Sequence, residues 1–202
     1  MGVFSIVRQP KLYSYVVEHD TGHAPNPYFG VCTLCRCKFR TDPTKPRNVV
    51  EQAGEGDWVV GTGGSNPRRS AGNGRLVYAM RVGEKLTREE YFGDDRFAKK
   101  KPSATGAHAK RRGDNVTPAD DFEKFRQFAL ISSHFYYFGA SAVRIPEKFS
   151  ALEKKGPGFK CRFDPAFIAS FIRWLEKNRK PGKYAEPCQS EPRRERKCKS
   201  SC

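Results

Sequence analysis

The chain has 202 residues, of which 37% are hydrophobic and 12% aromatic, so it is long enough for one domain, with or without tails. Its 38 Lys and Arg outnumber its 22 Asp and Glu, which gives a net charge of +16. This balance favours a polyanionic partner, nucleic acid first, over the alternative that the charge serves solubility alone. No apolar run approaches the roughly 20 residues that cross a bilayer. The N-terminus is too short and polar for a signal peptide, so we expect a cytoplasmic protein without membrane association.

The seven cysteines are an odd number, which argues against a closed disulfide framework, and in the cytosol we expect them to be reduced. Cys32, Cys35 and Cys37 could bind zinc with His19 or His23 as a fourth ligand. A second cysteine pair of suitable spacing is missing, and free cysteine is often ordinary core material. We therefore expect no metal site. A zinc-stabilised nucleic-acid-binding module without catalysis is the alternative.

The first half of the chain predicts three strands separated by turn signals. Residues 12–18 alternate as a strand does, 58–60 form a buried strand after the Gly56-Asp57 turn, and 75–82 are apolar on both faces. Between them we expect loops at 41–55, with at most a short turn, and at 61–74, which is glycine-rich and basic. Thr87 predicts the N-cap of a helix, because Glu89 and Glu90 occupy its first turn.

The second half predicts a basic loop, a strand and a helix. Residues 96–113 read as the loop, 113–115 as a turn, 120–128 as a short helix and 128–139 as one buried strand, which 142–145 extend after a turn. A short helix follows at 146–155. Asp164 and Pro165 predict the N-cap and first position of the best helix, which continues to residue 180. From residue 186 on, the charged composition indicates a disordered basic tail.

The segment HDTGHAPNPY, residues 19–28, places groups that are costly to bury in a stiff loop directly after a strand. His19 and Asp20 could act as a general acid/base pair, with Asp20 orienting the histidine. Alternatively, Asp20 begins an Asx-type turn and His19 only ends the strand. His134 is the other candidate base.

Two further segments suggest ligand contacts. Thr62 lies in a glycine-rich stretch that could hold a phosphate with backbone N–H groups, and Arg68 and Arg69 follow it; the alternative is a flexible hairpin loop. Tyr136 and Tyr137, in the SSHFYYF strand, could line a pocket and stack on a base, whereas the neighbouring phenylalanines fit a core. The basic loops at 99–101 and 110–112 are expected to contact phosphates or to be solvated.

The chain shows two family resemblances. GDWVVGTGG followed by GRLVYAMRV is similar to PUA-like domains of the EVE and ASCH branches. HDTGHAPNPY, CTLCRCK, RLVYAMRV, YFGDDRF, RGDN and ISSHFYYFG together resemble the second type of nucleotide-modification-associated domain, a family found near phage and mobile-element systems that hypermodify DNA bases. This resemblance implies the following polar candidates: His19, Asp20, Thr21, Asn26, Cys32, Asp57, Thr62, Arg112, Asp114, Asn115, His134 and Tyr137.

We therefore expect an α+β fold, with a curved mixed β-sheet or a PUA-like barrel flanked by helices. The domain should span residues 12–187, after an N-terminal segment of 1–11 and before a tail of 188–202. We expect it to bind a nucleotide or a modified base in DNA modification or its recognition, between the 19–26 loop and the strand carrying His134 and Tyr137. The expected partner is nucleic acid, DNA before RNA, or a nucleotide, and other base-modification proteins are further candidate partners. The sequence does not identify a cofactor or decide between an enzyme and a reader.

Overall fold

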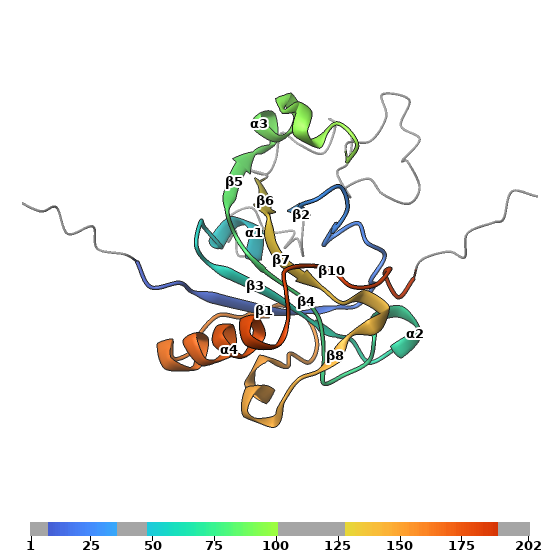
Figure 1. The fold of residues 1–202 in the computed structure, drawn as a ribbon, viewed down its shortest axis with the longest axis vertical. Helices are drawn as coiled ribbons and strands as arrows, with labels where there is room; N and C mark the ends of the chain where they lie inside the picture. The colour runs from blue at the N-terminus through green and yellow to red at the C-terminus, as the bar shows by residue number, and fades with distance from the viewer. Residues whose placement is uncertain (1–7, 36–47, 101–127, 190–202) are drawn as a thin grey trace, which may run out of the picture.

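The computed structural model describes residues 8–35, 48–100 and 128–189, and these form an α+β fold around a large mixed sheet (Figure 1). The strand order is β10-β7-β4-β3-β1-β9, and β8 pairs with β4. The strands are β1 (Leu12–Val17), β3 (Trp58–Gly63), β4 (Arg75–Arg81), β7 (His134–Tyr137), β8 (Val143–Arg144), β9 (Phe159–Lys160) and β10 (Gly182–Lys183). The predicted fold class is confirmed. Within the described residues the sheet is open at both ends, so it does not form the PUA-like barrel.

Five strands of this sheet, β1, β3, β7, β8 and β10, run in one direction, and β8 is among them because it is antiparallel to β4. β1 and β3 are parallel, with Val17 opposite Gly63 at their carboxyl ends. β4 is antiparallel to both β3 and β7, so β7 shares the direction of β3. β10 is parallel to β7, with Lys183 opposite Tyr137. The carboxyl ends of β1, β3, β7 and β10 therefore lie along one edge, where parallel sheets commonly present functional residues.

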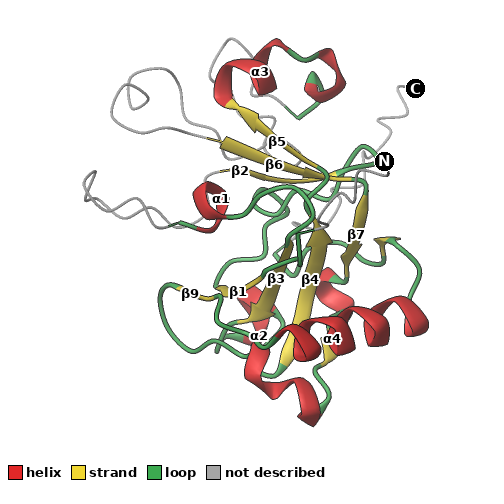
Figure 2. Ribbon diagram, turned by 90° about the vertical axis from the view of Figure 1, so that its left-hand side faces the viewer, coloured by secondary structure: helices red, strands yellow, loops and turns green. Residues whose placement is uncertain are grey.

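A second, three-stranded sheet covers one face of the large sheet, and helix α4 covers the other (Figure 2). The small sheet has the order β2 (Cys32–Cys35), β6 (Phe128–Ser132), β5 (Glu84–Thr87). Helix α3 (Arg88–Gly93) follows β5 and is capped as predicted, because the Thr87 side chain accepts a hydrogen bond from the Glu90 N–H. A short 3-10 helix, η1 (Asp95–Phe97), comes next.

The prediction of a single strand at residues 128–139 is wrong. The chain forms β6 and β7, which belong to different sheets, and Ser133 lies between them with its side chain exposed. The Ser132 hydroxyl donates to the His134 carbonyl at 2.8 Å across this change of direction. A continuous apolar pattern is compatible with one long strand or two short ones, so periodicity does not locate the break. The turn predicted at 113–115 and most of the helix predicted at 120–128 lie outside the described residues.

The predicted C-terminal helix is confirmed as α4 (Pro165–Asn178). The Asp164 carboxylate accepts hydrogen bonds from the N–H groups of Ala166 and Phe167, at 2.8 and 3.4 Å. Its buried residues Ile168, Phe171 and Leu175 pack against the large sheet. The short helix before it is a 3-10 helix, η4 (Glu147–Leu152), and a further 3-10 turn, η3 (Gly139–Ser141), follows β7.

Two one-turn helices lie in segments that the sequence predicted as loops. α1 (Val49–Gln52) provides the short turn allowed at 41–55. α2 (Pro67–Ser70) is capped by Asn66. The first residues of the glycine-rich stretch predicted as a loop belong to a strand, because β3 extends to Gly63. None of the helices in the described ranges has the length and apolarity that crossing a membrane requires.

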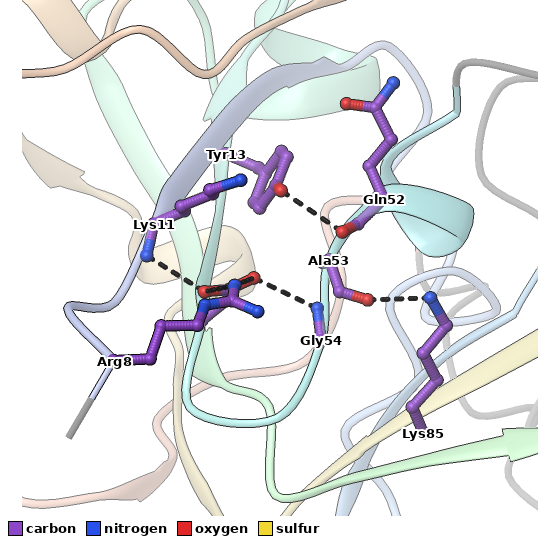
Figure 3. A network of polar contacts seen from close by, with 8 residues as sticks. Arg8, Lys11, Tyr13, Gln52, Ala53, Gly54 and Lys85 are labelled. Atoms are coloured by element: carbon purple, nitrogen blue, oxygen red, sulfur yellow. Dashed lines mark hydrogen bonds and ion pairs between the residues drawn. The ribbon is translucent and has the colours of Figure 1, made fainter. Parts of the chain in front are cut away.

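A buried carboxylate closes the turn that precedes β3 (Figure 3). Asp57 is fully buried. Its two oxygens accept hydrogen bonds from the Arg8 guanidinium at 2.6 Å, the Lys11 N–H at 2.9 Å and the Gly54 N–H at 3.0 Å. The Lys85 ammonium donates to the Ala53 carbonyl nearby, at 2.9 Å. Asp57, a candidate by family resemblance, therefore ties the N-terminal strand to this turn, at the end of β3 away from the common carboxyl edge.

Candidate functional site at the carboxyl edge of the sheet

The carboxyl edge brings together three residues that are far apart in the sequence. Asp20 lies three residues after β1, Tyr137 ends β7 and Cys188 follows β10. The Tyr137 hydroxyl donates to Asp20 Oδ1, and the Cys188 N–H donates to Oδ2 at 2.9 Å. Asp20 is 1% exposed, so both of its carboxylate oxygens have partners away from water.

Burial dominates the ionisation of this cluster. It raises the pKa of Asp20, and the hydrogen bonds from Tyr137 and Cys188 act in the opposite direction. Burial and the Asp20 charge raise the pKa of Tyr137 well above its usual range, and for the same two reasons the pKa of the Cys188 thiol rises to about 11. The Tyr137 hydroxyl and the Cys188 thiol therefore stay protonated at neutral pH. The protonated Tyr137 hydroxyl is the donor to the Asp20 carboxylate.

The cluster joins the loop at residues 19–28 to the segment at 182–189. The Asp20 carbonyl accepts from the Gln189 N–H at 2.9 Å, and the Tyr28 hydroxyl donates to Glu186 Oε2 at 2.8 Å. A Cβ on Gly22 would lie 2.6 Å from the Pro187 ring, so this contact requires glycine. Sequence reasoning missed Cys188 and Gln189, because their charged surroundings look like a tail. The described structure instead pairs them with Asp20.

His19 and Asp20, predicted to work as a pair, make separate contacts. The His19 side chain is exposed, and its Nδ1 lies 3.0 Å from Gln189 Oε1. The Asp20 carboxylate is directed to Tyr137 and Cys188 instead. Thr21, the next predicted binding residue, is half-buried beside them.

His134 and Tyr136 lie on the other face of the sheet from Tyr137. Successive side chains of a strand point to opposite faces, so Tyr137 joins the core under the small sheet and Tyr136 joins the core under α4. His134 Nε2 lies 3.1 Å from the Tyr136 hydroxyl and 3.6 Å from Glu176 Oε1 of α4. Of the three predicted pocket residues on this strand, the structure places only Tyr137 beside Asp20.

Asn26 is buried and belongs to a hairpin that a lysine stabilises from inside. Asn26 and Thr33 exchange backbone hydrogen bonds of 2.9 Å each. The Lys100 ammonium donates to Asn26 O, Asn26 Oδ1, Val31 O and Thr33 Oγ1, at 2.9 to 3.2 Å. Lys100 was predicted with its neighbours to contact phosphate or solvent, but it is fully buried, and burial lowers its pKa to about 8.

The glycines of the predicted phosphate loop are explained by close packing within the protein. A Cβ on Gly61 would lie 2.3 Å from the Tyr78 ring, and one on Gly63 would lie 2.0 Å from the Gly72 carbonyl oxygen, so these glycines allow close packing. Thr62 is buried and donates to the Tyr15 carbonyl at 3.3 Å. Arg68 and Arg69 are exposed on α2, and an open hollow lined by Ser65, Asn66, Pro67 and Arg68 lies there.

Comparison with known families places the chain in one of them. The profile of the family described as nucleotide modification associated domain 2 matches residues 9–128 and 120–194 of the chain. The chain belongs to this family. No curated protein and no solved structure is significantly similar to it.

The match to nucleotide modification associated domain 2 includes every residue of the Asp20 cluster, Cys188 among them. Arg112, Asp114 and Asn115, which the resemblance also suggested, lie outside the described residues. Cys32 and Cys35 are both buried in β2 but face different hydrophobic clusters, and Cys37 is not described. Within the described ranges, no group of three or more His, Cys, Asp or Glu side chains is placed to hold a metal ion.

Proposed function

We propose that this domain binds a nucleotide or a modified base, most readily in DNA, and acts in base modification or in the recognition of modified bases. The family match over residues 9–194 carries the proposal. The net charge of +16 supports a polyanionic ligand. The carboxyl edge supports it too, because β1, β3, β7 and β10 end there and the segments after them carry polar groups.

The geometry favours recognition over acid/base catalysis by the predicted pair. Asp20 was expected to orient His19 or to supply a proton, but its oxygens accept from Tyr137 and Cys188. In this arrangement Asp20 positions the loop, and the exposed His19 imidazole can hydrogen-bond a base edge. A base within a duplex would have to be flipped out to reach it.

Catalysis by His19 is the second candidate, and one contact favours it. An amide oxygen only accepts hydrogen bonds, so the 3.0 Å contact with Gln189 Oε1 assigns the proton to Nδ1. Nε2 is then the basic nitrogen of an exposed imidazole, as a general base requires.

Replacing His19 with alanine separates the two functions. For a reader, His19→Ala should weaken binding of a labelled DNA oligonucleotide, and mass spectrometry should find the same nucleosides in cells with and without the protein. For an enzyme, the variant should abolish a modified nucleoside with little loss of binding. His134→Ala is the matched control, because this histidine lies on the opposite face of the sheet and should affect neither readout. Wild-type protein that neither binds DNA or nucleotides nor changes the nucleoside profile would refute the proposal.

A further inference from the structure

Phe29 combines an unfavourable backbone conformation with an exposed apolar side chain. Its φ is 59°, in the left-handed region that bulky residues rarely adopt, and its side chain is 42% exposed. Backbone strain and an apolar ring in water both cost free energy. A purely structural role does not account for these two costs together, whereas contact of the ring with a ligand would.

The hairpin that carries Phe29 is built to keep this conformation. Phe29 and Gly30 form its tip, and both have positive φ, the combination found in type I′ turns, for which Asn-Gly is the favoured pair. The Asn26 side chain accepts from the Tyr28 N–H at 3.2 Å. Lys100 fixes the base of the hairpin through Asn26, Val31 and Thr33. The ring of Phe29 is thus displayed on a rigid base.

The neighbouring side chains have the chemistry of a nucleotide contact. The Tyr28 ring lies 6.3 Å from the Phe29 ring, centre to centre, and the Lys183 ammonium lies 4.8 Å from the centre of the Tyr28 ring. Tyr28 also donates to Glu186, which connects it to the segment that covers Asp20. An aromatic face beside a cation at the margin of a polar site is what single-stranded nucleic-acid binders present to a base and its phosphate.

We propose that Phe29 is a stacking platform for an unpaired nucleobase that enters the carboxyl-edge site. This inference rests on the proposed function and names the ligand group and the residue that receives it. The base can belong to a strand, single or flipped from a duplex, or to a free nucleotide, because both sources present the same aromatic face.

The test uses the full chain and two probes, a fluorescein-labelled single-stranded DNA 12-mer and an abasic 12-mer with the same phosphates. Fluorescence anisotropy at fixed salt should show that wild-type protein prefers the probe that has bases. Phe29→Asn creates the favoured Asn-Gly pair, so its melting temperature should be unchanged or higher. It should lose about 5- to 150-fold in affinity for the probe with bases, the equivalent of one stacked base. Affinity for the abasic probe should not change, and Phe29→Trp should retain the preference.

Tyr184→Asn is the control, because this aromatic side chain is 45% exposed but packs on Phe138, at 5.1 Å between ring centres. An equal loss in both Asn variants, or a preference retained in Phe29→Asn, would overturn the inference. Equal binding of both probes by wild-type protein would also overturn it and leave binding by charge alone. No binding of either probe would refute the proposed function itself. Displacement of the probe by a deoxynucleoside monophosphate, dependent on Phe29, would identify a free nucleotide as the source of the base; failure to displace it would identify a strand.

Discussion

Two buried charged side chains fix the segment between residues 19 and 33. Asp20 accepts from Tyr137 and Cys188 at one end, and Lys100 donates to four oxygens of the hairpin at the other. A buried charge is tolerated only when hydrogen-bond partners replace the lost water. Both groups are satisfied within the protein, and their contacts hold in place the backbone next to the exposed side chains of His19 and Phe29.

The Tyr137 hydroxyl should be important for stability. Tyr137→Phe removes a donor from a buried carboxylate, so it should lower the free energy of unfolding by about 1.5–3 kcal/mol. Urea unfolding at neutral pH measures this change. The control is Tyr136→Phe, which removes a hydroxyl whose partner is the half-exposed His134, and it should cost about 0.5–1.5 kcal/mol. Equal losses of unfolding free energy in the two variants would show that the buried Asp20 carboxylate does not need the Tyr137 hydroxyl as a donor.

Lys100 should make stability depend on alkaline pH. Burial lowers its pKa from 10.5 to about 8, against the attraction of Cys32 and Cys35. Between these two values the unfolded chain still binds the proton that the folded chain has released, so the free energy of unfolding should rise with pH. Relative to Lys100→Met, wild-type protein should gain up to about 3 kcal/mol from pH 8 to pH 10.5.

Urea unfolding with a reductant present, at several pH values in this range, measures the difference between the two proteins. The control is Lys99→Met, which removes an exposed neighbouring lysine and should leave the pH dependence of wild type unchanged. A constant difference between wild type and Lys100→Met would show that the four oxygens keep the ammonium charged despite its burial.

At the scale of elements, local sequence signals predicted the features that depend on neighbouring residues, such as the start of a helix. They failed for features that depend on contacts between distant segments, such as the break in a strand. The Asp164 cap with Pro165 located the start of α4, and the Thr87–Glu90 box located α3, because capping involves residues close in sequence. The break at Ser133 was not predictable in this way. It depends on β6 pairing with β2 and β5 while β7 pairs with β4 and β10.

The candidate site shows the same division. Sequence reasoning identified Asp20, Asn26 and Tyr137 as polar groups in an unusual setting, and the structure places Asp20 beside Tyr137. It misplaced His134 because the face of a strand follows from its register, which a one-residue shift reverses. It missed Cys188 because parallel pairing of the two-residue β10 with β7 brings that segment to Asp20, and so short a strand leaves little pattern in the sequence.

At the scale of the whole molecule, the positive charge is unevenly distributed. Residues 144–183, which include η4 and α4, contain eleven Lys and Arg and four Asp and Glu. Residues 8–35 and 48–100 together contain eleven and ten. η4 and α4 pack on the face of the large sheet opposite the small sheet, and most of the basic side chains of this segment are exposed. We therefore expect phosphate contacts on this layer, and the proposed base contact at the carboxyl edge.

This division of roles predicts a local effect on the salt dependence of DNA binding. Each phosphate contact contributes about 0.9 to the slope of log affinity against log salt concentration for duplex DNA, through counterion release. Reversing the charges of Lys177, in the last turn of α4, and of Lys180, two residues after the helix, should weaken duplex binding in low salt and reduce the slope by about 2. Fluorescence anisotropy between about 50 and 200 mM salt measures both quantities.

The matched control reverses Lys11 and Lys99, two exposed lysines outside this layer. It changes the net charge by the same amount, so a response to total charge alone would affect both variants equally. A local phosphate contact instead predicts that the slope falls only for the α4 variant, because counterions are released where phosphates are neutralised. Equal slopes in the two variants would place the DNA contact outside the 144–183 layer.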